Sequence, residues 1–297
     1  MTIALTGTSG KIGGKVLDRC VSGWSAAPGP GSELGDVVLL GRDPNVLTPG
    51  FDRRAAVYGD TAGMTTALAG VDTLFFVSGR ESATRQDEHY SVVDAAVAAG
   101  VTRIVYLSFL GNSATCTFTF GRHHYFTEQR IRDAGLDFTF LQDSLYQDYL
   151  PMMADAAGVI RGPAGDGVVS AVSTDDVADV AATVLRAIRN GDYSHSGASY
   201  RVTGPRAMSF DEIADTLGAA SGQKITYVRE TQAEAYESRA SFGAPAFEVE
   251  GWVTSYQAVG AGDLAAVSTD VESITGHAPV SFAHFLSAHP ETYEHLR

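Results

Sequence analysis

The stretch TIALTGTSGKIGGKVL (residues 2–17) decides the fold. Its apolar run Ile3 to Leu5 predicts a buried strand, and Lys11 to Cys20 has the apolar spacing of a helix. Gly7, Gly10 and Gly13 fall on the turn between them. Such a turn directs backbone N–H groups and the positive end of a helix at one point, which suits a phosphate. A purely conformational use of the glycines is the alternative.

The pattern behind this turn favours phosphate binding, because strands and helices go on alternating. Strand-like runs occur at Asp36–Leu40, Ala55–Tyr58, Thr73–Val77, Arg103–Leu107 and Asp137–Leu141. Helical patterns occur at Met64–Ala69, Glu88–Ala99 and His123–Ala134. Continuous apolar strands separated by helices are typical of a parallel sheet that is covered on both faces. The sequence therefore predicts a doubly wound α/β fold of the Rossmann type, which binds a dinucleotide.

Length and charge narrow the class of protein. With 297 residues, of which 44% are hydrophobic, the chain can bury a large core. Acidic residues outnumber basic ones by 35 to 21, the net charge is −14, and no Lys/Arg cluster is present. Phosphate backbones repel such a surface, so we expect no nucleic-acid partner. The oligomeric state stays open, with a homodimer as one assembly compatible with the sequence.

Cysteine usage and hydropathy indicate a cytoplasmic protein. Cys20 and Cys116 lack metal-ligand spacing, so we expect structural thiols in a reducing compartment and no metal. The N-terminus enters a strand directly, and no apolar run approaches the length of a membrane span. We therefore expect neither a targeting segment nor a membrane partner.

The end of the second strand bears on the choice of cofactor. Arg42 follows it and favours the 2′-phosphate of NADP(H) over the ribose hydroxyl of NAD(H). Asp43 comes next, and an N-cap at Asp43-Pro44 is an alternative use of this segment. The residues Ser22 to Gly35 predict an inserted loop between the first helix and this strand.

The remaining sequence predicts a second lobe. We expect a dinucleotide-binding domain over residues 1–150 and a substrate lobe over 151–297, with about 172–203 returning to the first sheet. Thr174 is a candidate N-cap of a helix that runs to Ile188, and Ser209 with Glu212 predicts a capping box. Aromatic residues between Tyr236 and Tyr256 predict either a pocket wall for a flat substrate or ordinary core.

At this point the chain resembles a known family, the NmrA-like group of atypical short-chain dehydrogenases/reductases, and within it the type 2 NAD(P)H:quinone oxidoreductases. The resemblance spans almost the whole chain. It is carried by TGTSGKIGG (6–14), LLGRDP (39–44), YGD (58–60), DAAVAAGVTRIVYLS (94–108), HYFTEQRIRDAGLDFTFLQ (124–142) and ITGHAPVSF (274–282).

The resemblance implies positions for the cofactor. The glycine turn would hold the pyrophosphate, Arg42 would face the adenosine ribose, Asp60 and Thr61 would lie near the adenine, and residues 77–79 would line the ribose path. Ser108, Phe109 and residues 142–146 would approach the nicotinamide. An Asx turn is the alternative for Asp60, and a strand end for Ser108. The implied cofactor residues are Gly7, Thr8, Ser9, Gly10, Lys11, Ile12, Gly13, Arg42, Asp60, Thr61, Val77, Ser78, Gly79, Ser108, Phe109, Asp143 and Ser144.

The usual proton donor of this superfamily, a Tyr-x-x-x-Lys pair, is missing. The chain has three lysines, Lys11, Lys15 and Lys224, and none stands four residues after a tyrosine. His124 and Tyr146 are the candidate catalytic residues. For His124 a surface pair with Glu128, one helical turn on, is the alternative.

A quinone needs little acid catalysis, because hydride transfer yields a stable aromatic anion. We therefore expect an NAD(P)H-dependent reductase of quinones or related aromatic carbonyl compounds, with NADP(H) preferred. Two alternatives are a tailoring oxidoreductase for aromatic polyketides, acting by reduction or by nicotinamide-supported oxygenation, and a dinucleotide-sensing NmrA-like regulator without turnover.

Overall fold

The computed structural model describes residues 1–24 and 36–297, and this part of the chain divides into two compact units. The first contains residues 1–108, 123–142 and 177–200, and the second residues 109–122, 143–176 and 201–297. Residues 109–122 and 143–150, which the prediction assigns to the dinucleotide-binding domain, lie in the second unit, and residues 177–200 lie in the first. The predicted loop over residues 22–35 lies outside the described residues from position 25 onward.

A seven-stranded sheet in the order β3-β2-β1-β4-β5-β6-β9 forms the centre of the first unit. Its strands are β1 (Ile3–Thr6), β2 (Val37–Gly41), β3 (Asp52–Ala55), β4 (Thr73–Val77), β5 (Arg103–Phe109), β6 (Asp137–Asp143) and β9 (Ala198–Val202). β1 pairs in parallel with both β2 and β4, so that Ile3 lies opposite Val37 on one side and Thr73 on the other. The strand order reverses at β1, which is the topological switch point of a doubly wound sheet.

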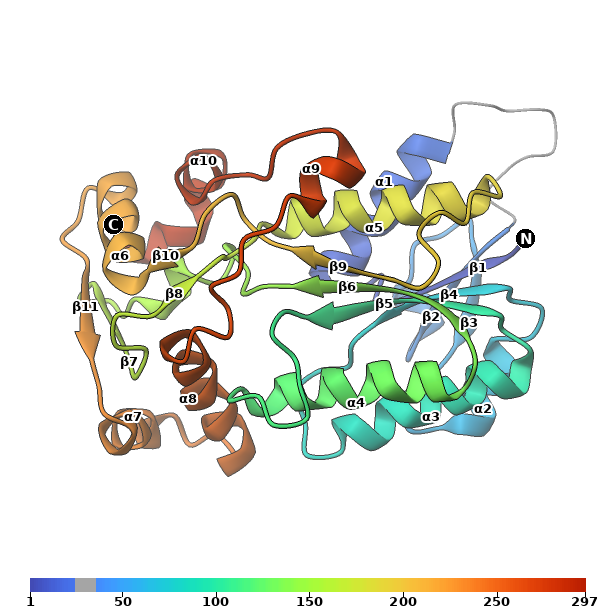
Figure 1. Cartoon of the computed structure of the whole chain (residues 1–297), viewed down its shortest axis with the longest axis horizontal. Helices are drawn as coiled ribbons and strands as arrows, with labels where there is room; N and C mark the ends of the chain where they lie inside the picture. Colours follow the sequence, from blue (N-terminus) through green and yellow to red (C-terminus); the bar gives the residue numbers. More distant parts are fainter. Residues whose placement is uncertain (25–35) are drawn as a thin grey trace. The chain divides into compact units, whose positions relative to one another are not determined.

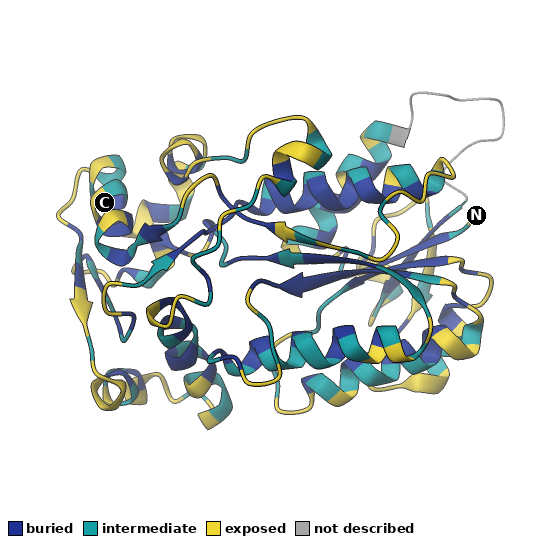
Figure 2. Cartoon of the chain, in the orientation of Figure 1, coloured by how far each residue is buried: buried dark blue, intermediate teal, exposed yellow. Residues whose placement is uncertain are grey.

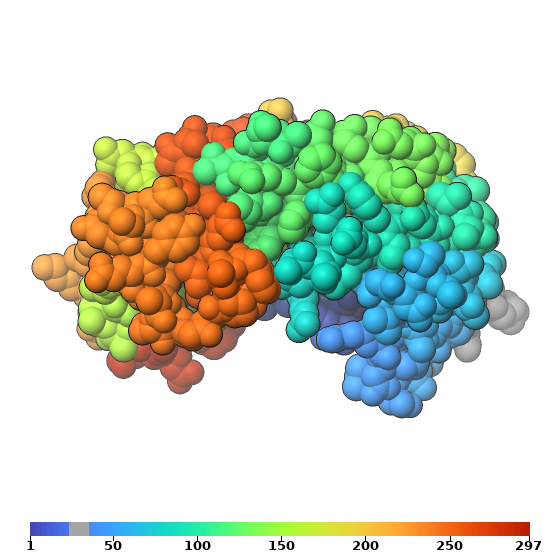
Figure 3. Space-filling view, turned by 90° about the horizontal axis from the view of Figure 1, so that it is seen from below, coloured from blue at the N-terminus to red at the C-terminus, as the bar shows by residue number. Residues whose placement is uncertain are grey.

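Helices cover both faces of this sheet, as the doubly wound prediction requires (Figure 1). α1 (Lys11–Trp24) and α5 (Thr174–Arg189) lie on one face. α2 (Thr61–Ala67), α3 (Arg85–Ala99) and α4 (Thr119–Asp133) lie on the other, and their outer surface is the blue, teal and green region of Figure 3. The predicted fold class is confirmed.

Burial in the core of the first unit explains why its central strands can be predicted from the sequence. β1, β2 and β4 are buried at almost every position, because helices exclude water from both faces (Figure 2). Phe75 and Phe76, neighbours on β4, are both fully buried although they point to opposite faces. A continuous apolar run is therefore the signature of these strands.

One predicted strand is wrong in its position. The sequence indicates Ala55–Tyr58, whereas β3 spans Asp52–Ala55 and exposes most of its residues. β3 is at the edge of the sheet, where one flank meets solvent and charged side chains are favourable. Apolarity therefore marks the segment after the strand rather than the strand itself.

The second unit is built from short strands and many helices around its own apolar core. β8 (Val168–Val169) pairs with β10 (Met208–Ser209), and β7 (Val159–Gly162) with β11 (Thr226–Arg229). The helices are α6 (Phe210–Ser221), α7 (Gln232–Arg239), α8 (Ala246–Gly260), α9 (Asp270–Thr275) and α10 (Phe282–Ala288). Short 3₁₀ turns add η1 (Pro44–Val46) in the first unit and η2 (Pro151–Met153), η3 (Ala240–Phe242) and η4 (Pro290–Leu296) in the second.

Two helix starts in this part of the chain were predicted from capping patterns. The box of Ser209 and Glu212 at the start of α6 is present, with both reciprocal hydrogen bonds. For α5 the predicted cap Thr174 is wrong by one residue. The Ser173 hydroxyl accepts from the Asp176 N–H at 3.0 Å, while the Thr174 hydroxyl donates to Asp148. Two adjacent cap-forming side chains made the sequence ambiguous here.

Cys20 and Cys116 are both free and buried. Burial raises the pKa of the Cys20 thiol to about 12. No helix in the described ranges is long and apolar enough to cross a membrane.

Gly13 supplies a test of the opening turn. A Cβ atom there would lie 2.2 Å from the carbonyl oxygen of Gly7, a backbone atom that cannot move without distorting the turn. We expect Gly13→Ala to lower the free energy of unfolding by roughly 1–3 kcal/mol, the range of an overpacked site. Urea denaturation measures this change.

Gly10→Ala is the matched control, because a Cβ atom there meets only the Gly7 oxygen at 3.3 Å. Equal losses in the two variants would contradict the steric account.

Candidate functional site

A pocket of about 480 Å³ lies in the first unit at the carboxyl ends of β1, β2 and β4. This is the edge at which doubly wound sheets bind ligands. The wall combines the glycine turn, the end of β2, the segment after β3, the loop after β4 and one residue of α3. The lining residues are Thr6, Gly7, Ser9, Gly10, Leu40, Gly41, Arg42, Ala56, Val57, Tyr58, Val77, Ser78, Gly79, Arg80 and Glu88.

The glycine turn lets backbone form one wall of this pocket. Gly7 has a φ of +69°, and a Cβ atom there would lie 2.9 Å from the Cβ of Val77. The Gly10 N–H closes the turn on the Gly7 oxygen at 2.9 Å. The buried Thr8 hydroxyl has no hydrogen-bond partner among the described residues. A buried, unsatisfied hydroxyl beside a backbone cradle fits a site that takes a phosphate.

Two arginines and one glutamate give the pocket its charge. Arg42 and Arg80 are exposed at its wall, and the Glu88 carboxylate accepts from the Thr84 hydroxyl at 2.7 Å. Asp43 caps η1 by accepting from the Asn45 N–H at 2.9 Å. The N-cap alternative is therefore realised at Asp43, whereas Arg42 lines the pocket and its contact with a 2′-phosphate stays a prediction.

Tyr58 connects the segment after β3 to β4. Its hydroxyl donates to the Val77 carbonyl at 2.7 Å, and burial raises the pKa of this phenol well above its usual range. The Thr6 hydroxyl accepts from the Val77 N–H at 2.9 Å. Both polar groups of Val77 are thus bound by side chains, which fixes the start of the loop that lines the pocket.

Two residues further along, both backbone polar groups of Gly79 are bound by side chains of α3. The Gly79 N–H donates to His89 Nε2 at 2.8 Å, and Arg85 Nε donates to the Gly79 oxygen at 2.8 Å. Because Nε2 of His89 accepts, its proton is on Nδ1, which faces the Thr127 hydroxyl at 2.9 Å. We call His89 and Arg85 the Gly79 clamp.

His124, a candidate catalytic residue, belongs to the support of this clamp. Arg85 Nη2 lies 2.9 Å from His124 Nε2, and a guanidinium can only donate, so the ring proton is on Nδ1. That proton faces the Tyr106 hydroxyl at 2.9 Å. His124 is buried, and both ring nitrogens are bound within the unit.

Burial, followed by the positive charge of Arg85, holds the pKa of both His89 and His124 well below the usual range. Both rings are therefore neutral at neutral pH. The alternative of an exposed pair between His124 and Glu128 is wrong, because Glu128 is also buried.

Glu128 instead faces β5 and β6. Its carboxylate accepts from the Ser108 hydroxyl at 2.6 Å and from the Gln142 side chain at 2.9 Å. Ser108 is fully buried at this position. Its predicted contact with the nicotinamide stays a prediction, since its hydroxyl already has a carboxylate partner.

The structure gathers part of the predicted site into the pocket. Seven predicted cofactor residues line it, namely Gly7, Ser9, Gly10, Arg42, Val77, Ser78 and Gly79. Thr8, Lys11, Ile12 and Gly13 belong to the same turn and to the start of α1 without lining the pocket. Asp60 is the N-cap of α2 and accepts from the Gly63 N–H, and Thr61 begins that helix. Asp60 is thus a helix N-cap rather than an Asx turn, because its side chain bonds the N–H three residues on, and its contact with the adenine stays a prediction.

Phe109, Asp143, Ser144 and Tyr146 belong to the second unit. There the Tyr146 hydroxyl donates to Asp143 at 2.6 Å. The Ser144 hydroxyl is buried without a hydrogen-bond partner among the described residues.

Sequence reasoning missed several residues of the pocket. Ala56, Val57 and Tyr58 line it, although their sequence predicts a strand. Their apolar character, directly after a strand in the fold, was the available signal. Arg80 and Glu88 gave no such signal, because isolated charges after a strand and in a helix are common on any surface. The Gly79 clamp was also missed.

A seven-stranded doubly wound sheet with a glycine-turn pocket at its switch point defines an α/β protein of the Rossmann type. The chain belongs to the NAD(P)H-binding family, whose model matches residues 7–187. The resemblance to the NmrA-like atypical short-chain dehydrogenases/reductases is confirmed, and the chain is an NAD(P)H-dependent oxidoreductase.

Individual relatives cover most of the chain. It is 30% identical over 292 residues to quinone oxidoreductase 2 of Escherichia coli, covering 96% of this chain and 97% of that protein. It is also 30% identical over 233 residues to the NAD(P)H azoreductase of Xenophilus azovorans, covering 77% and 79%. The crystal structure of the E. coli NADPH-dependent quinone oxidoreductase with NADPH superposes with a TM-score of 0.85 at 29% identity, covering 97% and 99%.

The two buried histidines predict a pH dependence of stability. An unfolded histidine titrates near pH 6.5, whereas the folded pKa of His89 lies well below this value. The unfolded state therefore binds more protons as the pH falls below about 6.5, and stability decreases toward acid. We expect each histidine to contribute a slope of about 1.4 kcal/mol per pH unit between pH 6 and the folded pKa.

Urea denaturation between pH 7.5 and 5 measures this slope in His89→Gln, which keeps an acceptor for the Gly79 N–H. The slope should become shallower by about 1.4 kcal/mol per pH unit, the contribution of one histidine. His284→Gln, at an exposed position, is the control and should leave it unchanged. An unaltered slope in the His89 variant would show that this ring does not titrate as inferred.

Proposed function

We propose that this chain binds NADPH in the pocket of its first unit and transfers hydride to a quinone or related aromatic carbonyl compound. The observation that carries the cofactor part is the joint presence, in one pocket, of a backbone glycine cradle and Arg42. The substrate part is supported by the similarity to quinone oxidoreductase 2 and by the missing Tyr-x-x-x-Lys pair.

The glycine turn and Thr8 would hold the pyrophosphate. Backbone N–H groups at the start of α1 donate to phosphate oxygens, and the positive helix end favours their charge. The Thr8 hydroxyl is buried and does not line the pocket, so it would reach a phosphate oxygen through an adjustment of the turn on binding. Lys11, at the start of α1, would add positive charge.

Arg42 would pair with the 2′-phosphate of NADPH. A guanidinium can donate two parallel hydrogen bonds to a phosphate, whereas the ribose hydroxyl of NADH offers it no charge. Arg80, exposed on the same pocket, is the other cation that could carry this preference. The Gly79 clamp would keep the loop carrying Ser78 and Arg80 in one conformation while the cofactor binds.

The reaction needs little proton chemistry from the protein. Bound NADPH supplies a hydride from its nicotinamide. The quinone gains two electrons in this step and becomes a hydroquinone monoanion, which takes its proton from water. Neutral His89 and His124 act as positioning residues in this scheme, and Tyr146 stays a predicted catalytic residue.

Turnover under nitrogen tests the substrate class. We expect purified protein to oxidise NADPH when 1,4-benzoquinone or menadione is present and oxygen is absent. Absorbance at the nicotinamide band follows the reaction. Gly10→Val should abolish it, because the valine side chain would fill the phosphate side of the pocket.

Consumption of NADPH that requires oxygen would instead favour the tailoring oxidoreductase. Failure with every quinone under both atmospheres, with NADPH still bound in calorimetry, would overturn the quinone proposal.

Arg42→Ala tests the cofactor preference. A hydrogen bond to a charged group contributes about 1.5–3 kcal/mol, so we expect NADPH to bind roughly 10- to 150-fold more weakly. NADH binding should change little. Calorimetry with both cofactors measures the two losses. Arg80→Ala is the matched variant, and a larger selective loss there would transfer the assignment to Arg80.

A further inference from the structure

A second pocket, of about 880 Å³, lies wholly within the second unit. It is formed by η2, β7, the segment of α7 and η3, and α8. Its volume is within the range of small-molecule sites, which is roughly 300–1,000 Å³. We call it the α7–α8 pocket.

The apolar wall of the α7–α8 pocket is unusually exposed. Phe242 and Met152, with exposed fractions of 70% and 67%, are the two most exposed large apolar side chains of the described residues, and both line it. Exposed apolar groups gathered at one concave site indicate a ligand rather than chance. Methionine adapts its shape to different ligands, which suits such a rim.

Aromatic rings line the same pocket. Phe242 and Trp252 meet edge to face with their centroids 6.0 Å apart. Tyr256 is buried, and its ring stacks on Phe210 with centroids 4.8 Å apart. The pocket wall therefore offers exposed aromatic surface at Phe242, with the buried Tyr256 ring behind it, which suits a flat aromatic ligand.

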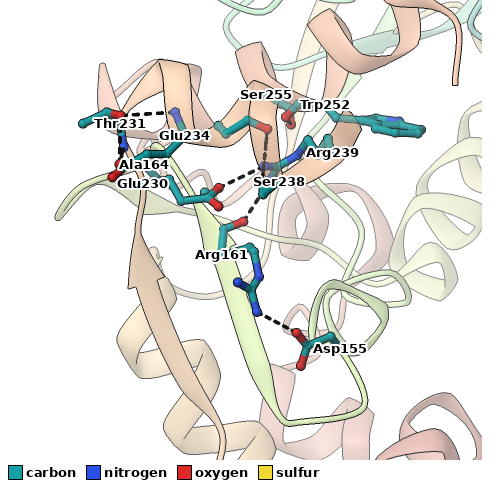
Figure 4. Close-up of polar contacts among 12 residues, drawn as sticks. Asp155, Arg161, Ala164, Glu230, Thr231, Glu234, Ser238, Arg239, Trp252 and Ser255 are labelled. Carbon is teal, nitrogen blue, oxygen red and sulfur yellow. Dashed lines mark hydrogen bonds and ion pairs between the residues drawn. The ribbon is translucent and has the colours of Figure 1, made fainter. Parts of the chain in front are cut away.

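The charges at the pocket are balanced by partners from the protein itself (Figure 4). Arg239 Nη1 pairs with Glu230 at 2.9 Å, both side chains being more than nine-tenths buried, and Arg239 Nη2 donates to the Arg161 carbonyl. Arg161 Nη2 pairs with Asp155 at 2.7 Å. Because each arginine has a carboxylate partner, the pocket favours a neutral ligand over an anion.

Arg161 nevertheless offers the ligand a hydrogen bond. A guanidinium has five N–H donors, and its ion pair with Asp155 is made through Nη2. Arg161 lines the pocket and its side chain is about two-fifths exposed, so a ligand in the pocket can reach its guanidinium. A carbonyl oxygen on the ligand would match these donors.

We propose that the α7–α8 pocket binds a neutral, flat aromatic molecule whose carbonyl oxygen accepts from Arg161. The proposal concerns the second unit by itself and does not depend on hydride transfer. A titration without NADPH therefore tests it independently of any turnover assay.

The two tryptophans of the chain, Trp24 and Trp252, allow a direct reporter. Full-length Trp24→Phe protein retains Trp252 as its single tryptophan, and 9-fluorenone serves as the probe. We expect saturable quenching of Trp252 emission and a matching calorimetric isotherm. Fluorene, which lacks the carbonyl, and 9-fluorenone-2-carboxylate, which adds a charge, should both bind more weakly.

Three variants in this background locate the ligand. Phe242→Ala should weaken 9-fluorenone binding by about 2- to 12-fold, the equivalent of one aromatic contact. Arg161→Met should weaken 9-fluorenone binding by roughly 10- to 150-fold, the equivalent of one hydrogen bond from a charged donor, and leave fluorene binding unchanged. Val267→Ala removes an exposed apolar side chain of the same unit outside the pocket and should have no effect.

Both pocket residues are at least two-fifths exposed, so their variants should fold, which circular dichroism checks. Absence of saturable binding up to the solubility of 9-fluorenone would overturn the proposal. Equal affinities in the Phe242 variant and its parent, or tighter binding of the carboxylate, would overturn it as well.

Discussion

The close approach of Gly7 and Gly13 is the constraint on which the dinucleotide site depends. The carbonyl oxygen of Gly7 occupies the space that the Cβ atom of a side chain at position 13 would need. The chain can therefore turn from β1 into α1 within a few residues, and the first turn of the helix arrives at the edge of the sheet. Without this proximity, backbone N–H groups could not be gathered beside the carboxyl ends of β2 and β4.

The loop after β4 shows how the rest of the pocket is made rigid. Val77 is bound by Thr6 and Tyr58, and Gly79 by His89 and Arg85. Side chains from β1, the segment after β3, and α3 thus hold successive peptides of one loop. A backbone that forms a binding wall needs such support, because its own hydrogen-bonding groups lie outside the sheet ladder.

The sequence was sufficient for the doubly wound fold and for the glycine turn, since both rest on local patterns. Strands that are buried on both faces appear in the sequence as continuous apolar runs, and a turn that only glycine can form is marked by its glycines. The predicted position of β3 was wrong because an edge strand tolerates charged residues, so its own sequence is not apolar. The sequence is ambiguous at the start of α5, because Ser173 and Thr174 are adjacent and both residue types cap helices. His124 could not be assigned, because its partners Arg85 and Tyr106 lie 39 and 18 positions away and no periodicity connects them.

The state of the cysteines has a consequence for the proposed chemistry. Quinones are Michael acceptors and alkylate thiolates, so an enzyme that handles them is exposed to arylation by its own substrate. Cys20 is buried with a pKa of about 12, and Cys116 is buried as well. A thiol that is both hidden and protonated reacts slowly with electrophiles. With quinones as the proposed substrates, Cys20 and Cys116 would therefore escape alkylation during repeated turnover.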